Sequence, residues 1–411
     1  MSRELVDSGI EWIGKIPSNW KLERLQWHLD EINEKNTPVK TTNILSLTNK
    51  LGVVPYSEKG NQGNVAKENY DEYKIAYPDT IVANSMNILI GSVGYCNYYG
   101  CVSPVYYVYK AKEKNSIKFW NYLFQSQQFQ KELRKYANGI LEIRLRVSSN
   151  DILKRYAAIP SIEEQEKIVA ILDKKVQQID ALIANQEKQI EKLNEYKQAV
   201  ITKAVTKGLD PNAEMKDSGV EWIGLMPEKW NTIKFKYLFN NSNTGESIDK
   251  TYWTDDETKP VFYTAGLNKI HTCYSDFPEE KLTKEEDLLM SRNGTPYVFI
   301  PDKNAMYTDH VIRVDLKKQK NKNFISYTLQ QSIKNVIVDS VSLATWSISL
   351  WKQQVLTWPS DNEQEEIVRF LDKKCDEIDN LVKIKQSKIE KLQEYKKSLI
   401  YEYVTGKKRV D

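Results

Sequence analysis

The sequence predicts an α/β (α+β) protein in which two mixed α/β domains are separated by two long helices. These helices are expected to form an antiparallel coiled coil, giving a pseudo-twofold internal repeat. Residues 7–20 read DSGIEWIGKIPSNW and residues 217–230 read DSGVEWIGLMPEKW, with 9 of 14 positions identical. Residues 160–206 match residues 359–405 at 24 of 47 positions. The stretches between these phrases do not align convincingly. The sequence therefore consists of a repeated frame, residues 7–20 with 160–206 and 217–230 with 359–405, around two segments of different sequence.

This pattern divides the 411 residues into four segments. Residues 1–159 and 209–358 are expected to be globular domains, and residues 160–208 and 359–411 are expected to be long helices. A chain of this length has room for two or three domains of ordinary size, each with its own core.

Composition restricts the compartment and the class of protein. The four cysteines (Cys96, Cys101, Cys273 and Cys375) form no CxxC pair and no metal-binding spacing, so we expect reduced thiols. No signal peptide is recognisable and no apolar run reaches the roughly 18 residues that span a bilayer, so we expect a cytoplasmic protein. The net charge is only +3. Residues 1–159 alone lean basic, with 21 Lys and Arg against 16 Asp and Glu, so affinity for nucleic acid has to come from local clusters.

The two helical segments carry clear start and stop signals. Residues 161–207 contain no Pro or Gly, acidic residues occupy the first turns, and Gly208 with Pro211 ends the segment. One helix of about 47 residues, about 70 Å long, is therefore expected there. The second copy is expected from Ser360 to about Thr405, before Gly406.

Apolar residues in both helices recur every seven residues. A stripe this narrow cannot bury itself on a globular core, but it can bury itself against another such stripe. Pairing of the two helices is therefore preferred over two separate surface helices. The predicted pairing residues are Val169, Leu172, Val176, Ile179, Ile183, Ile190 and Leu193 in the first helix and Val368, Leu371, Ile378, Val382, Ile389 and Leu392 in the second.

The connection between the helices favours an antiparallel arrangement. A parallel pair would require residues 209–358 to carry the chain back about 70 Å before the second helix begins. The seam is interrupted at equivalent positions by Gln186 and Lys385. Polar seam residues commonly fix register, so we expect both near the pseudo-twofold axis.

Each globular segment has the composition of a mixed α/β domain. Strands are expected within 43–48, 81–85, 88–96 and 102–110 of the first domain, followed by one amphipathic helix over 116–137. The second domain repeats this order, with strands within 260–265, 287–301 and 306–316 and a helix from about 323 to 337. Two copies of one fold with diverged surfaces are therefore expected.

Catalytic motifs are missing from the sequence. It contains no G-x-G-x-x-G, no Walker loop and no Asn/Asp-Pro-Pro-aromatic tetrapeptide. The three histidines, His28, His271 and His310, are not spaced to bind a metal with a neighbouring carboxylate. Asp302 and Lys303 lack the second acidic residue of a nuclease pattern. We therefore predict a recognition protein with no catalytic residues and no metal site.

The duplicated DSG-x-EWIG-x-x-P-x-x-W opening and the P-S-x-x-EQE-x-IV start of each long helix are a specific combination. Together with the alternation of variable segment and repeated helix, they resemble the specificity subunit of a Type I restriction-modification system. The resemblance in layout covers essentially the whole chain.

This resemblance implies functions for each segment. Residues 1–159 and 209–358 would be target recognition domains, each reading one half of a split, asymmetric sequence in double-stranded DNA. The helices would set the spacing between the halves and dock two methyltransferase subunits, and restriction subunits could join. Adenine methylation with S-adenosylmethionine, and DNA cleavage with ATP and Mg²⁺, would belong to those partners and need no cofactor in this chain.

Candidate DNA contacts lie first at turns between strands. In the first domain these are Asn84, Ser85, Asn87, Ser92 and Tyr95, where small residues and amides let the backbone approach a groove. In the second domain Arg292 could fork onto a guanine edge, Asn293 could pair with adenine, and Thr295 follows. Ordinary hairpin turns are the competing interpretation, since Asn-Gly is a strong turn signal.

A second set of candidates precedes each long helix. Alternating arginines on a strand face one side and suit phosphates, although a solvated sheet face is the competing interpretation. The residues are Arg144, Arg146, Lys154 and Arg155 in the first half, and Thr345 and Ser347 in the second.

The rival function is a coiled-coil adaptor that displays two binding domains and does not bind DNA. It accounts for the helices and the missing catalytic motifs. It does not account for two shared frames that enclose unrelated contents.

Overall fold

The computed structural model describes residues 4–48, 52–60, 69–112, 115–139, 145–266, 268–334, 336 and 345–410. The chain forms two compact units: Met1–Glu187 with Gln386–Asp411, and Lys188–Lys385. Each unit therefore combines a globular domain with parts of two helices that are distant in the sequence.

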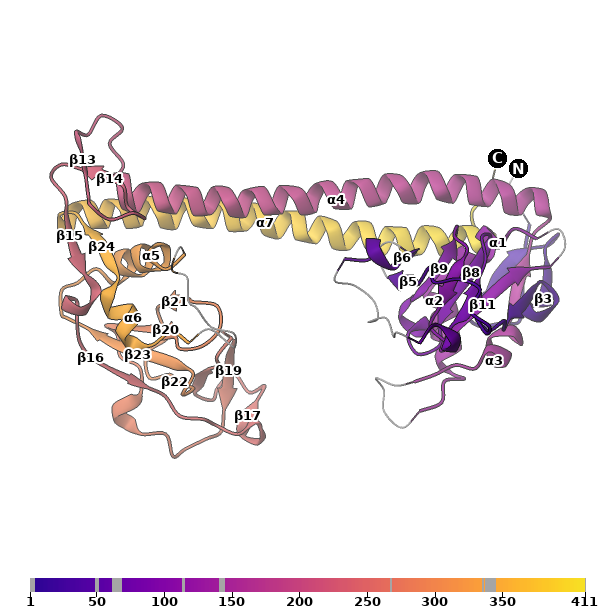
Figure 1. Cartoon of the computed structure of the whole chain (residues 1–411), viewed down its shortest axis with the longest axis horizontal. Helices are drawn as coiled ribbons and strands as arrows, with labels where there is room; N and C mark the ends of the chain where they lie inside the picture. Colours follow the sequence, from indigo (N-terminus) through magenta and orange to yellow (C-terminus); the bar gives the residue numbers. More distant parts are fainter. Residues whose placement is uncertain are drawn as a thin grey trace. The chain divides into compact units, whose positions relative to one another are not determined.

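The first unit is built largely from antiparallel strands and three short helices (Figure 1). Its central sheet has the strand order β4-β11-β8-β9. Helix α1 packs on β8 and β9, and Phe119, Trp120 and Phe124 of α1 are fully buried. The elements are β1 (Leu5–Asp7), β2 (Lys15–Pro17), β3 (Lys21–Arg24), β4 (Leu29–Ile32), β5 (Leu45–Thr48), β6 (Gly52–Pro55), β7 (Lys74–Ala76), β8 (Thr80–Asn84), β9 (Val93–Cys96), β10 (Gly100–Val102), β11 (Tyr106–Ala111), α1 (Ile117–Gln125), α2 (Gln127–Arg134), α3 (Ser149–Leu153) and β12 (Tyr156–Ile159).

The second unit repeats this topology. Its central sheet has the order β16-β23-β20-β21, which corresponds strand for strand to β4-β11-β8-β9. A second four-stranded sheet, β17-β19-β18-β22, covers part of the domain. The elements are β13 (Met215–Asp217), β14 (Leu225–Pro227), β15 (Asn231–Lys234), β16 (Phe239–Thr244), β17 (Trp253–Thr254), β18 (Val261–Tyr263), β19 (Lys269–Thr272), β20 (Asp287–Ser291), β21 (Val298–Phe299), β22 (Met306–Tyr307), β23 (Val311–Leu316), α5 (Lys322–Ser332), α6 (Ile348–Gln353) and β24 (Val355–Trp358).

A serine cap and a left-handed glycine interrupt two elements that were expected to be continuous. The helix expected over 116–137 is two helices, because Ser126 has extended backbone angles and its hydroxyl accepts the N–H of Phe129 to cap α2. The strand expected over 88–96 begins instead with a 3-10 turn at Ile88–Ile90, which ends at Gly91 with φ +86°. The apolar composition of both stretches reflects burial, which does not by itself distinguish one element from two.

The long helices run from Ile162 to Lys207 (α4) and from Asp361 to Val404 (α7). In the first unit the start of α4 packs against the end of α7, with Leu172 and Leu399 in one core. In the second unit the end of α4 packs against the start of α7, with Ile201 and Leu371 in one core. The predicted antiparallel pairing is therefore confirmed within each unit (Figure 1).

The seam is unevenly buried along its length. Val169, Leu172 and Ile179 of α4 are at most 8% exposed, as are Val368, Leu371, Ile378 and Ile389 of α7. Val176, Ile183, Ile190, Leu193, Val382 and Leu392 are half-buried. Of the two polar seam residues, Gln186 is buried and Lys385 is half-buried. Leu172 and Leu371, which have no exposed surface, lie in cores shared with a globular domain.

Equivalent ion pairs join the helices in the two units. Lys396 Nζ lies 2.7 Å from Asp180 Oδ1 in the first unit, and Lys197 Nζ lies 2.7 Å from Asp379 Oδ2 in the second. Each residue of one pair is the repeat copy of a residue in the other. The duplicated sequence therefore forms the same cross-helix contact twice, once in each unit.

The repeated opening phrase attaches each domain to the start of a long helix. Trp20 Nε1 donates to Glu164 Oε2 at 2.9 Å, and Trp230 Nε1 donates to Glu363 Oε1 at 3.1 Å. Gly208 (φ +74°) ends α4 so close to Trp230 that a Cβ would lie 3.1 Å from its ring. The two repeated phrases of the sequence thus contact each other in each unit, through a Trp–Glu hydrogen bond.

Among the described residues, no helix is both long enough and apolar enough to cross a membrane.

Removal of a seam leucine should destabilise the chain. Leu172 and Leu371 have no exposed surface, so Leu172→Ala or Leu371→Ala should each lower the free energy of unfolding by about 2–5 kcal/mol. Urea denaturation followed by circular dichroism measures this. The control is Leu182→Ala on the same helix, because Leu182 is 46% exposed and its loss should change the free energy little. Equal effects at Leu172 and Leu182 would contradict a buried seam.

Candidate nucleic-acid interface

The first domain joins two short segments at the end of β8. The chain after β8 passes through Ser85 and Met86 into the 3-10 turn, and residues 145–148 lead into α3. The backbone N–H of Val147 donates to the Ser85 carbonyl at 3.4 Å and ties the two segments together. We call residues 84–92 with 145–148 the first platform.

Most of the predicted contacts in the first platform shape the turn. Asn84, Ser85 and Ser92 are at most 5% exposed, and Asn84 Oδ1 accepts the N–H of Met86 at 3.0 Å. Of the predicted contacts in this platform, Asn87 and Arg146 have exposed side chains. Arg146 Nη2 lies 3.5 Å from Met86 Sδ, so its guanidinium group reaches across from the second segment.

The second domain forms the corresponding arrangement at the end of β20. The N–H of Trp346 donates to the Arg292 carbonyl at 2.7 Å, and Asn293 bridges Thr345 in antiparallel fashion. We call residues 291–297 with 345–347 the second platform. Arg292, Thr295, Thr345 and Ser347 are exposed there.

Histidine 310 supports the second platform, and sequence reasoning did not assign it this role. Its carbonyl accepts the N–H of Arg292 at 2.9 Å, and its Nδ1 lies 2.8 Å from Asn293 Nδ2. Arg292 Nη1 also donates to the Asp309 carbonyl at 3.2 Å. The turn before β23 thus orients both candidate base-reading side chains. His310 lies 18 residues after Arg292 and belongs to no motif, so the sequence gives no signal of this contact.

Each platform consists of two segments, and its exposed arginine lies on a different one of the two in each domain. The Val147–Ser85 and Trp346–Arg292 hydrogen bonds make Ser85 equivalent to Arg292 and Arg146 equivalent to Thr345. In the first platform the arginine belongs to the segment before α3. In the second it belongs to the turn after β20. Equivalent backbone therefore presents the same cationic group from two different positions.

Four predicted contacts lie away from these exposed arginines or outside the described residues. Tyr95 pairs with Ile81 farther along the sheet, and its hydroxyl donates to Asp79; burial and this bond raise the pKa of Tyr95 to about 12. Lys154 and Arg155 follow α3, at the opposite end of that helix from Arg146. Arg144 lies outside the described residues.

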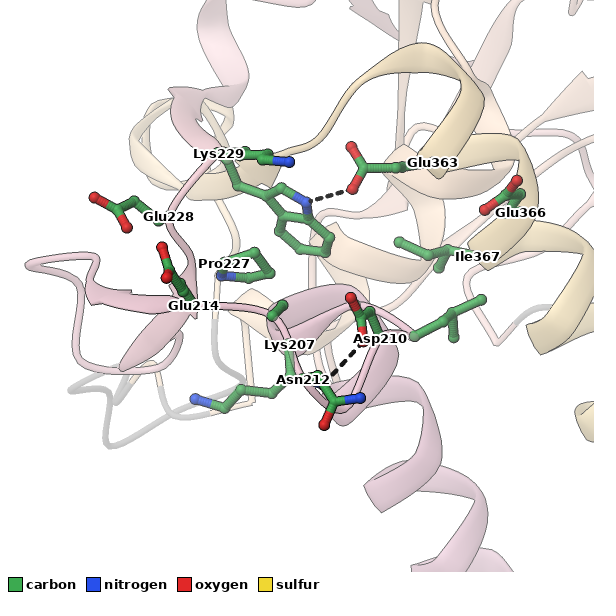
Figure 2. Close-up of a pocket in the computed structure, with 14 residues that line it drawn as sticks. Lys207, Asp210, Asn212, Glu214, Pro227, Glu228, Lys229, Glu363, Glu366 and Ile367 are labelled. Carbon is green, nitrogen blue, oxygen red and sulfur yellow. Dashed lines mark hydrogen bonds between the residues drawn. The ribbon is translucent and has the colours of Figure 1, made fainter.

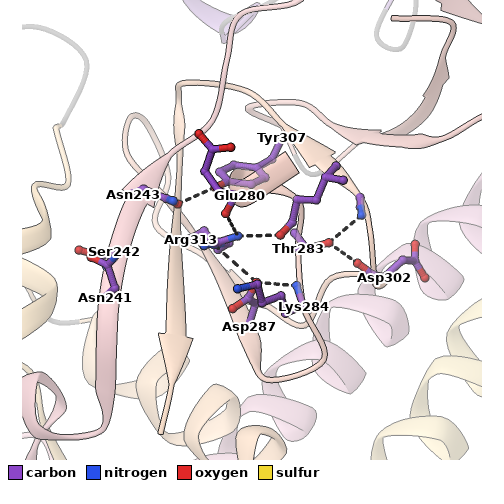
Figure 3. Close-up of polar contacts among 12 residues, drawn as sticks. Asn241, Ser242, Asn243, Glu280, Thr283, Lys284, Asp287, Asp302, Tyr307 and Arg313 are labelled. Carbon is purple, nitrogen blue, oxygen red and sulfur yellow. Dashed lines mark hydrogen bonds and ion pairs between the residues drawn. The ribbon is translucent and has the colours of Figure 1, made fainter. Parts of the chain in front are cut away.

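A buried polar network holds the start of β20, the strand that leads into Arg292 (Figure 3). Asp287 begins β20 with no exposed surface, and its Oδ2 lies 3.5 Å from Arg313 Nε. Arg313 Nη1 donates to the carbonyls of Glu280 and Leu282 at 3.1 and 2.6 Å. Burial raises the pKa of Asp287, against the opposing effect of its hydrogen bond from Lys284 N. These contacts tie residues 280–287 to β23.

A separate recess of about 510 Å³ in the second unit lies beside Trp230 (Figure 2). Residues 207–214, the turn at 227–230 and the first turns of α7 line it. Its charged residues are the carboxylates Asp210, Glu214, Glu228, Glu363 and Glu366 and the amines Lys207 and Lys229. An excess of carboxylates repels phosphates, so this recess is a poor nucleic-acid site.

Other chemistry has little support in the described part of the chain. There, no group of three or more His, Cys, Asp and Glu side chains is placed to hold a metal ion. All four cysteines are free, and burial raises the pKa values of Cys96, Cys101 and Cys375. Raised thiol pKa values disfavour the reactive thiolate.

The comparisons with known proteins identify the family. The family model described as Type I restriction modification DNA specificity domain matches residues 17–192 and 227–394, one match in each repeat. The chain belongs to this family. It is a specificity subunit, and its function in DNA recognition is favoured over that of an adaptor that does not bind DNA. Specificity subunits are components of Type I restriction-modification systems.

Relatives of this specificity subunit align along its whole length. The Type I restriction enzyme MjaVIII specificity subunit of Methanocaldococcus jannaschii is 23% identical over 422 residues, covering 96% of this chain and 94% of the relative. The putative type I restriction enzyme MjaX specificity subunit of the same organism is 24% identical, with 97% and 96% covered.

A solved structure shares the fold of the specificity subunit. It concerns complex assembly and conformational transition of the type I R-M system, and one chain of it matches with a TM-score of 0.68 at 12% identity. The match covers 95% of this chain and 98% of that one.

The buried carboxyl of the specificity subunit gives a pH prediction. Because the pKa of Asp287 is raised above its ordinary 3.8, the folded state keeps this proton at pH values where the unfolded chain has lost it. The contribution of Asp287 to stability therefore falls as pH rises from about 4 through the raised pKa. Asp287→Asn removes the titration while leaving Arg313, Lys284 and Asp315 in place.

The measurement is urea unfolding of both proteins between about pH 4 and pH 8. The free energy of unfolding of the wild type minus that of Asp287→Asn should decrease as pH rises. A difference that stays constant or increases across this range would contradict a raised pKa.

Proposed function

We propose that the first and second domains are target recognition domains that read two different halves of one split, asymmetric DNA sequence. Residues 1–159 and 209–358 are the proposed domains. The helices, residues 160–208 and 359–411, are proposed to set the separation of the half-sites. Membership in the specificity family supports DNA recognition, and the two platforms support the division into half-sites.

The observation that carries this proposal is the position of the arginine, which lies before α3 in the first platform and after β20 in the second. A guanidinium group forks onto O6 and N7 of guanine, and each good bidentate contact is worth about 1–3 kcal/mol of discrimination. Arg146 and Arg292 project from non-equivalent positions of equivalent platforms. The same docking of both domains would therefore bring the arginines to different base steps.

The other exposed platform residues have proposed supporting roles. Asn87, Asn293 and Thr295 are proposed to contact base edges, and Thr345 and Ser347 to contact phosphates. Ser347 also caps α6, because its hydroxyl accepts the N–H of Leu350 at 3.3 Å. The buried Asn84, Ser85 and Ser92 are proposed to hold the turn that presents Asn87.

The catalytic steps are proposed to belong to partner subunits. Methyltransferase subunits would use S-adenosylmethionine to methylate adenine, and restriction subunits would use ATP and Mg²⁺ to cleave DNA. Two methyltransferase copies are proposed because the frame on which they dock is present twice.

Exposed apolar residues on the helices support a repeated docking face. Leu182 and Tyr395 in the first unit are 46% and 51% exposed, and their repeat copies Leu381 and Tyr196 in the second are 47% and 56% exposed. Each of the four residues directly precedes a position of the seven-residue repeat that faces the other helix: Ile183, Lys197, Val382 or Lys396. Residues at this position of two antiparallel helices lie on the same side of the pair. Tyrosine is enriched at protein interfaces, so a tyrosine beside an exposed leucine in each unit favours a docking face.

The decisive test of DNA reading is sequencing of methylated bases in DNA modified by the reconstituted system with and without this chain. A split motif with two half-sites and a fixed spacer should appear only with the chain present. A continuous motif, or no motif, would contradict two half-site readers.

Each arginine should control one half-site. Arg146→Gln and Arg292→Gln should each lower affinity for the cognate target by about 1–3 kcal/mol and relax preference in one half only. Competition binding with DNA altered in one half measures this. Arg292→Lys should retain the charge but not the fork, so specificity should fall more than non-specific binding.

The control for the arginine variants is Lys131→Gln, an exposed cation on α2 outside both platforms. It should leave both half-site preferences unchanged. Loss of preference in both halves from a single arginine variant would contradict the assignment of one arginine to each half.

Introduction of negative charge at the exposed leucine and tyrosine of one unit should prevent one methyltransferase subunit from binding. Leu182→Glu with Tyr395→Glu should lower the number of bound methyltransferase copies from two to one, because carboxylates are costly to bury at an apolar contact. The same changes at Leu381 and Tyr196 should remove the other copy. Native mass spectrometry counts the copies, and unchanged stoichiometry in both variants would refute this docking face.

A further inference from the structure

A recess of about 340 Å³ opens in the first unit beside the repeated opening phrase. It lies where β3, β12 and the residues after α2 and α3 meet. The side chains that matter to its chemistry are Trp12, Arg24, Tyr136, Lys154, Arg155 and Tyr156. Three of them are cations and three are aromatic.

Cations outnumber carboxylates in the lining of the recess by three to one. Its one carboxylate belongs to Glu132, whose Oε2 lies 2.9 Å from Lys135 Nζ outside the lining. Among the described residues, no hydrogen bond or ion pair engages the guanidinium of Arg24 or the amine of Lys154. The recess therefore presents two cationic groups, those of Arg24 and Lys154, that no described residue engages by a hydrogen bond or ion pair.

Tyrosine faces hold the two guanidinium groups in place. Arg155 Cζ lies 3.5 Å from the centroid of the Tyr136 ring, and its Nε donates to the Asp151 carbonyl at 2.9 Å. Arg24 Cζ lies 5.3 Å from the Tyr156 ring, its partner across the β3–β12 pair. A stacked guanidinium keeps its edge N–H groups free for a planar or tetrahedral oxyanion.

The fold does not require this cationic cluster. In the second unit the β15–β24 pair has the same register, and it places Lys234 opposite Val355 where the first unit has Arg24 opposite Tyr156. Lys154 and Arg155 are replaced by Gln353 and Gln354. The second unit therefore forms the same strand pair without arginine or tyrosine at the positions equivalent to Arg24, Arg155 and Tyr156.

We propose that this recess binds a phosphoryl group, with the aromatic side chains against the sugar or base attached to it. Two arginines and a lysine supply charge-assisted donors to the phosphate oxygens. The group could come from a free nucleotide or from a nucleic-acid backbone, since both present a phosphate beside a ring. The proposal does not depend on half-site reading by the platforms.

The test titrates the full chain with adenosine monophosphate in an isothermal calorimeter. Binding should weaken at least about tenfold in the Arg24→Gln, Lys154→Gln double variant, because both substitutions remove charge-assisted hydrogen bonds to the phosphate oxygens. The Lys131→Gln control should change affinity less than about twofold. Unchanged thermal unfolding of the double variant verifies its fold.

Two further arms distinguish the sources of the phosphate. A free monoester becomes a dianion above a pKa of about 6, so its binding should strengthen from pH 5.5 to 7.5, whereas a dinucleoside monophosphate should bind independently of pH. If the backbone is the ligand, the double variant should also lower the salt slope of DNA binding by about one to two phosphates.

A result in either arm supports the phosphoryl site and assigns its source. The proposal is overturned if adenosine monophosphate and the dinucleotide bind the wild type no more tightly than the double variant and the salt slope is unchanged. It is also overturned if the Lys131 control loses affinity as the double variant does.

Discussion

Burial of a narrow apolar seam between α4 and α7 is the constraint on which the rest of the fold depends, because neither helix can bury its stripe alone. Pairing is antiparallel, so each compact unit takes residues from one end of α4 and the other end of α7. The core of the first unit accordingly contains Trp12 and Leu172 together with Leu399. The compact units are therefore not the sequence repeats, and neither repeat holds all the apolar surface that its own domain buries.

This arrangement separates positions that hold the frame from positions that are free to change. Trp20 and Trp230 donate to equivalent glutamates at the helix starts, and equivalent Asp–Lys pairs cross the helices. At the platforms one backbone hydrogen bond is equivalent, Val147 to Ser85 and Trp346 to Arg292, yet the side chains differ. A frame fixed by repeated contacts can tolerate exchange of an exposed arginine between two neighbouring segments, since neither position contributes to the core.

Sequence patterns located the turns of the two platforms but not which of their side chains are exposed. The turns after β8 and β20 were identified from their Asn and Gly residues, but composition does not distinguish side chains that close a turn from those that project outward. Asn84 accepts a backbone N–H and is buried, whereas Asn87 is exposed. The support of Arg292 and Asn293 by His310, and the stacking of Arg155 on Tyr136, involve residues 17–19 apart in the chain. These contacts form between turns and loops that only the tertiary fold brings together.

By itself the sequence determined the duplicated frame, the two long helices and their antiparallel pairing, because these follow from periodicity, internal identity and the length of chain between the helices. The break between α1 and α2 at Ser126 and the 3-10 turn at Ile88–Ile90 were decided by local hydrogen bonds and a left-handed glycine. Only the tertiary structure decided that Arg146 and Arg292 occupy non-equivalent positions of equivalent platforms. That relation depends on which backbone groups pair across about 60 residues of intervening chain, and no local pattern encodes it.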